Sequence, residues 1–129
     1  MISVRVEGME EILRDLRKAQ ADVQQEAREV LKEQAKIIRD DARSRCPEDT
    51  GTLKKSVRLS VSRKGLNASV SAGGKVQGKD AYYAQFVEFG TKFAPAQPFL
   101  YPAGRAHEKE TEEKLVKVLT DAVRKGAGG

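Results

Sequence analysis

The chain has 129 residues, a formal net charge of +5, one cysteine and one histidine. This length suits a modest core, so we expect residues 1–129 to form a single domain. No apolar run approaches the ~20 residues of a membrane-spanning helix, and the N-terminus lacks the basic start and apolar stretch of a secretory signal. One cysteine also excludes an internal disulfide, so we expect a protein of the reducing cytoplasm with no membrane partner.

The N-terminal third predicts a strand followed by amphipathic helix. Apolar and polar residues alternate over 2–6, which favours a short strand ended by Gly8. Apolar residues then recur at steps of three and four over 9–42, with charged residues between them. This pattern predicts one long helix, or two helices with a break near residues 21–22. Pro47 ends the helical segment, because proline disfavours the α conformation in the residue before it.

The middle of the chain predicts a β-hairpin and a loop. Residues 57–62 and 67–72 alternate in polarity, and Lys64-Gly65 between them supplies a turn. Residues 73–79 are rich in glycine and lysine, which predicts a flexible basic loop. The whole surplus of positive charge lies in this part of the chain, because residues 47–105 hold nine basic and four acidic side chains.

The last third predicts two helices around an aromatic segment. We expect Asp80 to cap a short helix over 81–89. Residues 91–102 contain three prolines and read as irregular, and 103–125 read as a final helix with a frayed tail at 126–129. Together the elements predict an α+β fold, in which a small, mostly antiparallel sheet is packed by a long N-terminal helix and a C-terminal helix.

One segment resembles a catalytic motif. Asp49-Thr50-Gly51 matches the Asp-Thr-Gly of retroviral-type aspartic proteases, whose dimers bring two aspartates together to share a proton. That motif needs an apolar strand leading into it, whereas residues 45–48 are Arg, Cys, Pro and Glu and follow a helix. We therefore favour a turn in which Asp49 or Thr50 caps a short helical stretch through Leu53.

Other enzymatic readings lack a complete residue set. Cys46 and His107 are the only possible nucleophile pair, and the charged residues around His107 favour a solvated helix position. One cysteine and one histidine do not make a metal cluster, and Gly73-Gly74-Lys75 lacks the spacing of a phosphate-binding loop. We expect no enzymatic activity, metal or cofactor. The basic middle leaves nucleic-acid binding open, although no recognisable DNA-binding motif accompanies it.

Three blocks of the chain form a recognisable pattern. The first runs Pro47-Glu48-Asp49-Thr50-Gly51-Thr52-Leu53-Lys54-Lys55-Ser56, the second Tyr83-Ala84-Gln85-Phe86-Val87-Glu88-Phe89-Gly90-Thr91, and the third Ala96-Gln97-Pro98-Phe99-Leu100-Tyr101-Pro102-Ala103. In this order and spacing the sequence resembles the tail-component family of long-tailed bacteriophages, whose members act at the neck or tail-completion step. The positions that carry the pattern are Pro47, Asp49, Thr50, Gly51, Leu53, Ser56, Tyr83, Glu88, Phe89, Gly90, Thr91, Pro98, Phe99 and Pro102.

The resemblance implies a structural virion assembly protein that joins or completes the head–tail interface of a tailed phage or prophage. It would act as a subunit of a homo-oligomeric ring in the virion neck or tail, after assembly in the host cytoplasm. The implied partners are its own copies, phage connector and tail proteins, and DNA passing through the channel. A tail terminator or minor tail protein is the alternative. Within the basic loop, Lys75 and Lys79 are our candidate partner contacts, with an acidic protein surface favoured over DNA.

Several motif residues carry structural expectations. Clustered aromatic residues usually form a core, so we expect Phe86, Phe89 and Phe99 to be buried. Gly51 and Gly90 lie where the chain changes direction, so we expect both to need backbone angles that other residues rarely adopt.

Glu88 stands out because a carboxylate in the last turn of a helix opposes the helix macrodipole. We therefore expect it to have a cationic or hydroxyl partner. Thr91, a basic residue of the hairpin and a residue of a neighbouring subunit are the candidates.

Overall fold

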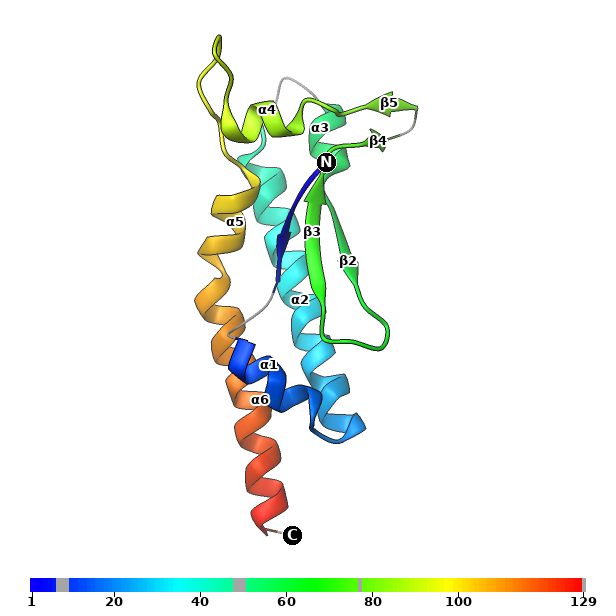
Figure 1. Cartoon of the computed structure of the whole chain (residues 1–129), viewed down its shortest axis with the longest axis vertical. Helices are drawn as coiled ribbons and strands as arrows, with labels where there is room; N and C mark the ends of the chain where they lie inside the picture. Colours follow the sequence, from blue (N-terminus) through cyan, green and yellow to red (C-terminus); the bar gives the residue numbers. More distant parts are fainter. Residues whose placement is uncertain (7–9, 48–50, 77, 129) are drawn as a thin grey trace.

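The sheet of the protein is small, antiparallel and packed on one face by helices. Figure 1 shows the computed structural model, which describes residues 1–6, 10–47, 51–76 and 78–128. Residues 126–128 are described by their backbone only. Three strands pair in the order β1-β3-β2, and both pairs are antiparallel. The strands are β1 (Ile2–Arg5), β2 (Arg58–Val61) and β3 (Ala68–Ala72). The predicted N-terminal strand and the predicted hairpin are thus confirmed.

Within the described residues, six helices and a second pair of strands accompany this sheet. The helices are α1 (Glu10–Arg17), α2 (Ala21–Arg45), α3 (Gly51–Ser56), α4 (Ala84–Phe89), α5 (Leu100–Ala106) and α6 (Glu108–Gly128). The short strands β4 (Lys75–Val76) and β5 (Lys79–Asp80) pair with each other. The predicted α+β class, with a long N-terminal and a C-terminal helix, is confirmed.

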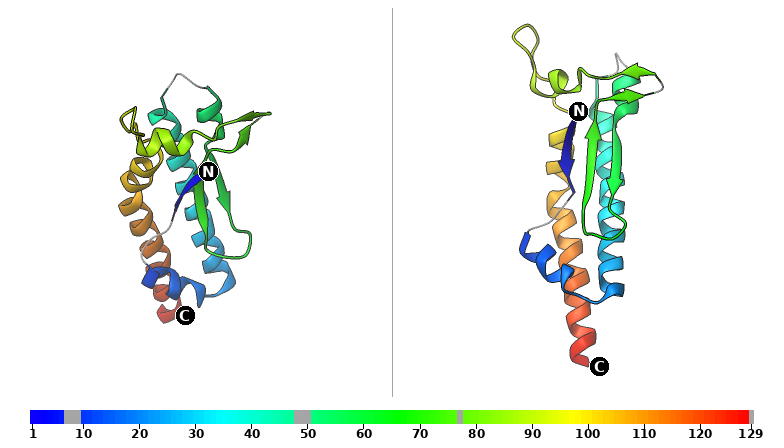
Figure 2. Two further views of the ribbon diagram at one scale, coloured as in Figure 1. Left: turned by 45° about the horizontal axis from the view of Figure 1, so that its top comes forward. Right: turned by 45° about the vertical axis from the view of Figure 1, so that its right-hand side comes forward.

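The molecule is elongated along its two long helices. In Figures 1 and 2, α2 runs beside α5 and α6, and the three-stranded sheet lies along α2. Helix α1 crosses one end, near the start of α2 and the end of α6. Helices α3 and α4 and the strands β4 and β5 gather at the other end. We call the end formed by residues 51–56 and 73–99 the head, and the end formed by residues 10–23 and 119–125 the foot.

The predicted helix over 9–42 is two helices, which was one of the two alternatives. The break lies at residues 18–20, where Gln24 Nε2 donates hydrogen bonds to the carbonyls of Arg17 (2.8 Å) and Ala19 (3.0 Å). These bonds satisfy carbonyls that the end of α1 leaves without helical partners. Helix α2 then buries one stripe of small and aliphatic residues at helical spacing: Ala27, Leu31, Ala35, Ile38 and Ala42.

One hydrophobic cluster joins the sheet to the helices. Val4 of β1 and Leu59 of β2 both lie opposite Val70 of β3, and this row faces the helices. The largest side chains that complete the cluster are Leu13, Leu16, Leu31, Ile38, Leu53, Phe99, Leu100 and Leu115. The alternate positions of the strands, such as Arg58 and Ser60, lie on the other face and are exposed. The alternation of the sequence therefore places the core on one side of the sheet.

The segment predicted as a flexible loop is a two-stranded ribbon in its described part. Lys75 lies opposite Asp80, and Val76 lies opposite Lys79. Gln77 lies outside the described residues, and the mobility of 73–79 stays a prediction.

The predicted cap and start of the short helix are wrong. Asp80 belongs to β5, and the Ala81 N–H donates to the Gly74 carbonyl (2.8 Å), which extends the ribbon instead of opening a helix. The helix therefore begins only at Ala84.

The predicted final helix is two helices, α5 and α6, which meet at His107. Helix α5 begins at Leu100, before the predicted start. Pro102 lies in its first turn, where backbone N–H groups have no partner within the helix, so the missing N–H of proline costs no helical hydrogen bond. The α6 backbone is helical to Gly128 and Gly129 lies outside the described residues, so the fraying of 126–129 stays a prediction.

The two glycine expectations have opposite outcomes. Gly90 has φ +79°, and an added Cβ would lie 2.7 Å from the Ala96 nitrogen, which confirms the prediction. Gly51 begins α3 with no positive φ and nothing within 4 Å of an added Cβ, so the prediction is wrong there. A helical start is open to any residue, so the turn needs no glycine. Asp49 and Thr50, the expected caps, lie outside the described residues.

Candidate assembly surface

Ser56, the last residue of the first motif block, fixes α3 against the sheet. Its side chain is buried, and its Oγ donates to the Leu53 carbonyl (2.6 Å) and accepts from the Gly73 N–H (3.0 Å). Leu53 is fully buried below it, and Pro47 is half-buried where α2 has ended. The first motif block therefore ties the end of α2 to the point where β3 ends and the ribbon begins.

Glu88 joins the second and third motif blocks. It is only 3% exposed, and its Oε1 accepts from the backbone N–H groups of Phe99 and Leu100, both at 2.9 Å. Its Oε2 accepts from the Tyr101 N–H (3.0 Å). The carboxylate thus caps the N-terminus of α5, where free N–H groups and the positive end of the macrodipole stabilise a negative charge.

The Glu88 partner that we expected was wrong. The Thr91 hydroxyl does not bind Glu88 but accepts from the N–H groups of Phe93 and Ala94, both at 3.1 Å. The partner is the backbone of another helix, which spacing along the chain did not reveal. The three direct hydrogen bonds from the N-terminus of α5 outweigh the unfavourable C-terminal end of α4.

The loop between α4 and α5 has an internal hydrogen-bond framework. Besides the bonds to its hydroxyl, the Thr91 N–H donates to the Ala94 carbonyl (2.9 Å), and the Gln97 N–H donates to the Val87 carbonyl (2.8 Å). These bonds shape the loop between α4 and α5, which contains Phe93 and projects at the top of Figure 1. Pro98 is exposed beside it.

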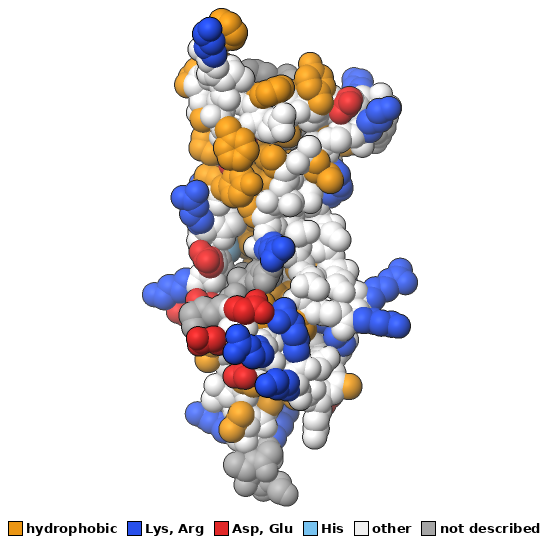
Figure 3. Space-filling model, viewed as in Figure 1, with side chains coloured by type: hydrophobic (Ala, Val, Ile, Leu, Met, Phe, Trp, Pro, Cys, Tyr) orange, Lys and Arg blue, Asp and Glu red, His pale blue; other side chains and the backbone are white. Residues whose placement is uncertain are grey.

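Four aromatic side chains of the head are exposed. Their exposed fractions are 65% for Tyr82, 45% for Phe86, 61% for Phe89 and 90% for Phe93. We call these four residues the aromatic surface. Figure 3 shows hydrophobic side chains gathered over the upper part of the molecule and at the tip of the projecting loop. Several exposed aromatic groups at one end of a molecule mark a candidate interaction site.

The prediction of a buried aromatic core is right for Phe99 and wrong for Phe86 and Phe89. Phe99 is fully buried. Helix α4 buries only Ala84 and Glu88, so its large aromatic residues face away from the core. Tyr83, another motif residue, is partly buried at the start of this helix.

Basic side chains lie on the other flank of the head. Lys75 and Lys79 are exposed on the ribbon. Beside them Arg43, Lys54 and Lys55 line a hollow together with Val76 of β4. None of the four lysines forms an ion pair with a carboxylate in the described part of the chain. The head therefore offers the aromatic surface and a cationic flank, by which we mean Lys54, Lys55, Lys75 and Lys79.

The structure does not support a Cys–His nucleophile. Burial raises the pKa of Cys46 to about 11, with Glu88 adding to the rise and Lys54 opposing it, so the thiol stays protonated near neutral pH. His107 Nε2 lies 2.9 Å from Asp41 Oδ2 and is thereby held by α2. No group of three metal-ligating residues occurs within 1–6, 10–47, 51–76 and 78–128.

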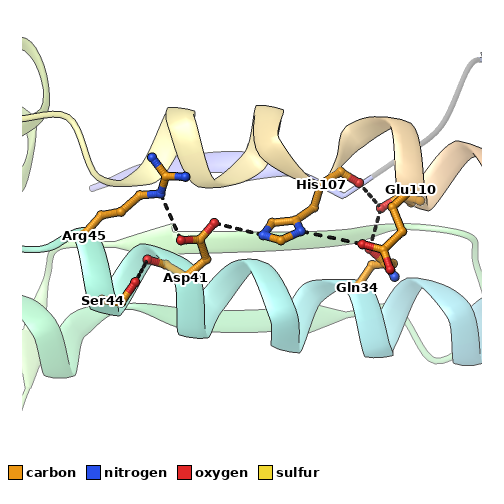
Figure 4. Close-up of polar contacts among 7 residues, drawn as sticks. Gln34, Asp41, Ser44, Arg45, His107 and Glu110 are labelled. Atoms are coloured by element: carbon orange, nitrogen blue, oxygen red, sulfur yellow. Dashed lines mark hydrogen bonds and ion pairs between the residues drawn. The ribbon is translucent and has the colours of Figure 1, made fainter.

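His107 belongs to a polar network that joins α2 to the start of α6 (Figure 4). Burial alone would raise the pKa of Asp41, but hydrogen bonds from Arg45 Nε (2.9 Å) and His107 outweigh it, so that the pKa lies below its usual range. Thr111 Oγ1 lies 3.0 Å from the Gln34 side-chain oxygen in the interior. The network is therefore explained by the packing of the helices.

The chain matches the model of a protein family. The model of the family described as “Bacteriophage HK97-gp10, putative tail-component” matches residues 10–90, which is well over half of the chain. The match covers the first motif block and the second up to Gly90, and it ends before the third. No curated protein and no solved structure matches the chain. Among the described helices, none is long and apolar enough to cross a membrane.

Proposed function

Since the chain belongs to the HK97-gp10-like family of bacteriophage tail components, we propose that it is a structural subunit of the phage neck, which joins or completes the head–tail interface. The observation that carries this proposal is the aromatic surface at the head. Large aromatic residues at this exposure are costly in a protein that stays alone, and they are the commonest anchors of protein interfaces.

The subunits would form a ring around the DNA channel. A ring needs a heterologous interface, in which two different surfaces of one chain meet and the rotation between copies closes. The elongated molecule supports this arrangement, because its head and foot are chemically different. The tail-terminator or minor tail role is the alternative, and the position of the protein in the virion separates the two.

The cationic flank of the head would contact a second kind of partner. Lys75 and Lys79 project from the ribbon without a described ion pair and would meet an acidic connector surface. We favour protein over DNA here, because tight phosphate contacts would hinder DNA passage. Phosphate binding would also make duplex affinity fall steeply with salt. A salt titration of duplex binding therefore separates these partners.

The neck role is tested by deleting the gene and complementing it with variants. Deletion should leave DNA-filled phage capsids and finished tails that do not join. Phe86→Ser with Phe89→Ser should fold, because both side chains are exposed, and should fail to restore joining. Gln85→Ser, an exposed change on the same helix, should restore it. Normal joining without the gene product would refute the neck role.

The partner contact is tested in the same assay. Lys75→Glu with Lys79→Glu should block joining, while duplex binding stays weak at all salt concentrations. Normal joining by this double variant would exclude the ribbon as a contact. Strong, salt-sensitive duplex binding that the variant loses would instead favour DNA as the partner.

A further inference from the structure

Exposed large hydrophobic side chains occur at both ends of the molecule. Apart from Met1, those of the described chain are the four residues of the aromatic surface and two valines of α6, Val116 (41% exposed) and Val123 (64%). Of the two valines, Val123 lies at the foot, far from the aromatic surface along the long axis (Figures 1 and 2). Each end of the subunit thus presents apolar groups that the chain itself does not cover.

The apolar groups of the foot line a hollow. It lies between the end of α1, the start of α2 and the last turns of α6. We call it the foot hollow, and its apolar lining residues are Ala19, Val23, Leu119, Ala122 and Val123. The polar residues around them are Asp15, Lys18, Gln20, Asp22 and Lys125. The foot hollow is therefore an aliphatic depression with charges of both signs at its margin.

The head carries a projection with the opposite shape. Phe93 of the projecting loop is 90% exposed, and the hydrogen bonds of Thr91 brace the loop from within. Lys92 Nζ lies 5.8 Å from the centre of the Phe93 ring. A braced loop loses little conformational freedom on binding, which favours affinity. Phe93 is therefore a preformed aromatic knob with a cation beside it.

We propose that Phe93 of one copy inserts into the foot hollow of a second copy. The inference rests on the proposed function, since it names the contact that would build the ring. An aromatic projection would fill an aliphatic depression, and Lys92 would approach the carboxylates of Asp15 and Asp22 at its margin. Two different surfaces on one chain suit a heterologous contact, whereas an isologous dimer needs one self-complementary surface.

Paired variants test this contact in solution. Phe93→Ser removes the knob and keeps the foot, and Val123→Glu places a charge in the foot hollow and keeps the knob. Both positions are exposed, so both variants should fold. Each variant alone should sediment as a monomer at concentrations where the unchanged protein associates. Their equimolar mixture should form a dimer and stop there, because it contains one intact contact.

Val116→Glu is the matched control. It adds the same charge to an exposed valine of the same helix outside the foot hollow, so it should associate like the unchanged protein. The proposal fails if the unchanged protein remains a monomer at millimolar concentration or if either single variant associates normally. It also fails if the mixture gives no dimer, because heterologous complementation is then absent.

A photo-crosslink identifies the occupant of the foot hollow. With p-benzoylphenylalanine at position 93, irradiation of the self-associated protein should yield peptides joined to residues 15–23 or 119–125 of another copy. Crosslinks elsewhere on the chain, or only to another phage protein during infection, would overturn the contact. If Val123→Glu abolishes self-association while phage capsids and tails still join, the contact is supported and the neck role is refuted. If Val123→Glu prevents joining but leaves self-association unchanged, the contact alone is refuted.

Discussion

Removal of the Glu88 carboxylate should destabilise the head strongly. Its two oxygens accept three backbone N–H groups at 2.9, 2.9 and 3.0 Å, and two of the donors, on Phe99 and Leu100, are buried. In Glu88→Ala these donors lose their acceptor without gaining water. In Glu88→Gln one amide oxygen can still serve Phe99 and Leu100, but the amide NH₂ would face the N–H of Tyr101.

The size of the effect follows from this geometry. A hydrogen bond to a charged group contributes about 1.5–3 kcal/mol, and a buried donor without an acceptor costs about 1–3 kcal/mol. The three hydrogen bonds are coupled and the Tyr101 donor is only part-buried. The loss of stability is therefore smaller than the sum of the three separate contributions. We expect Glu88→Ala to lower the free energy of unfolding by about 3–5 kcal/mol. Glu88→Gln should lower it by about 1–3 kcal/mol.

Urea unfolding followed by circular dichroism measures both values. For a chain of this length, 1 kcal/mol corresponds to roughly 3–5 °C in Tm, so the alanine variant should melt roughly 10–20 °C lower. Glu113→Gln, an exposed carboxylate change on α6, is the control and should stay within about 0.5 kcal/mol. If both Glu88 variants also stayed within that range, the carboxylate would not be the cap of α5 and the reasoning would be refuted.

Two further predictions concern backbone conformation and acid stability. Gly90→Ala should lower the free energy of unfolding by about 2 kcal/mol or more, because φ is +79° and the added Cβ would lie 2.7 Å from a backbone nitrogen. Gly51→Ala, where φ is ordinary and space is open, should leave it unchanged or raise it by up to ~1 kcal/mol. The lowered pKa of Asp41 means that its ion pairs stabilise the fold above the ordinary value of 3.8 and lose this effect as pH falls through the folded pKa. The stability gap between the unchanged protein and Asp41→Asn should therefore be present near neutral pH and close in acid, and a gap that widened in acid would contradict the assignment.

Patterns within short segments predicted most of the secondary structure. The alternation of 57–62 and 67–72 identified the hairpin, and the three- and four-residue steps of 9–42 identified the helices, because burial of one face imposes these periods. Gly90 was also predictable, since only a backbone with positive φ can end α4 and turn back at that point. The errors over 80–83 and 100–102 lie at element ends, where local preferences are weak and tertiary contacts decide.

Most residues of the motif blocks lie in the head, but the sequence did not show how they are used. Phe86 and Phe89 were expected in the core with Phe99, since all three are large and apolar. Only the packing of α4 shows that Ala84 and Glu88 take the inward positions and that the two phenylalanines face outward. The candidate assembly surface was therefore hidden among residues that sequence reasoning assigned to the core.

The chain's own pattern was enough for the fold class and the family, because periodicity and motif order are properties of neighbouring residues. The partner of Glu88 and the foot hollow depended on tertiary structure. Glu88 is 11 to 13 positions from the N–H groups that it accepts, and the foot hollow joins residues 15–23 to 119–125. Contacts at such separations arise only when helices pack, since a residue type carries no record of which distant backbone group it will meet.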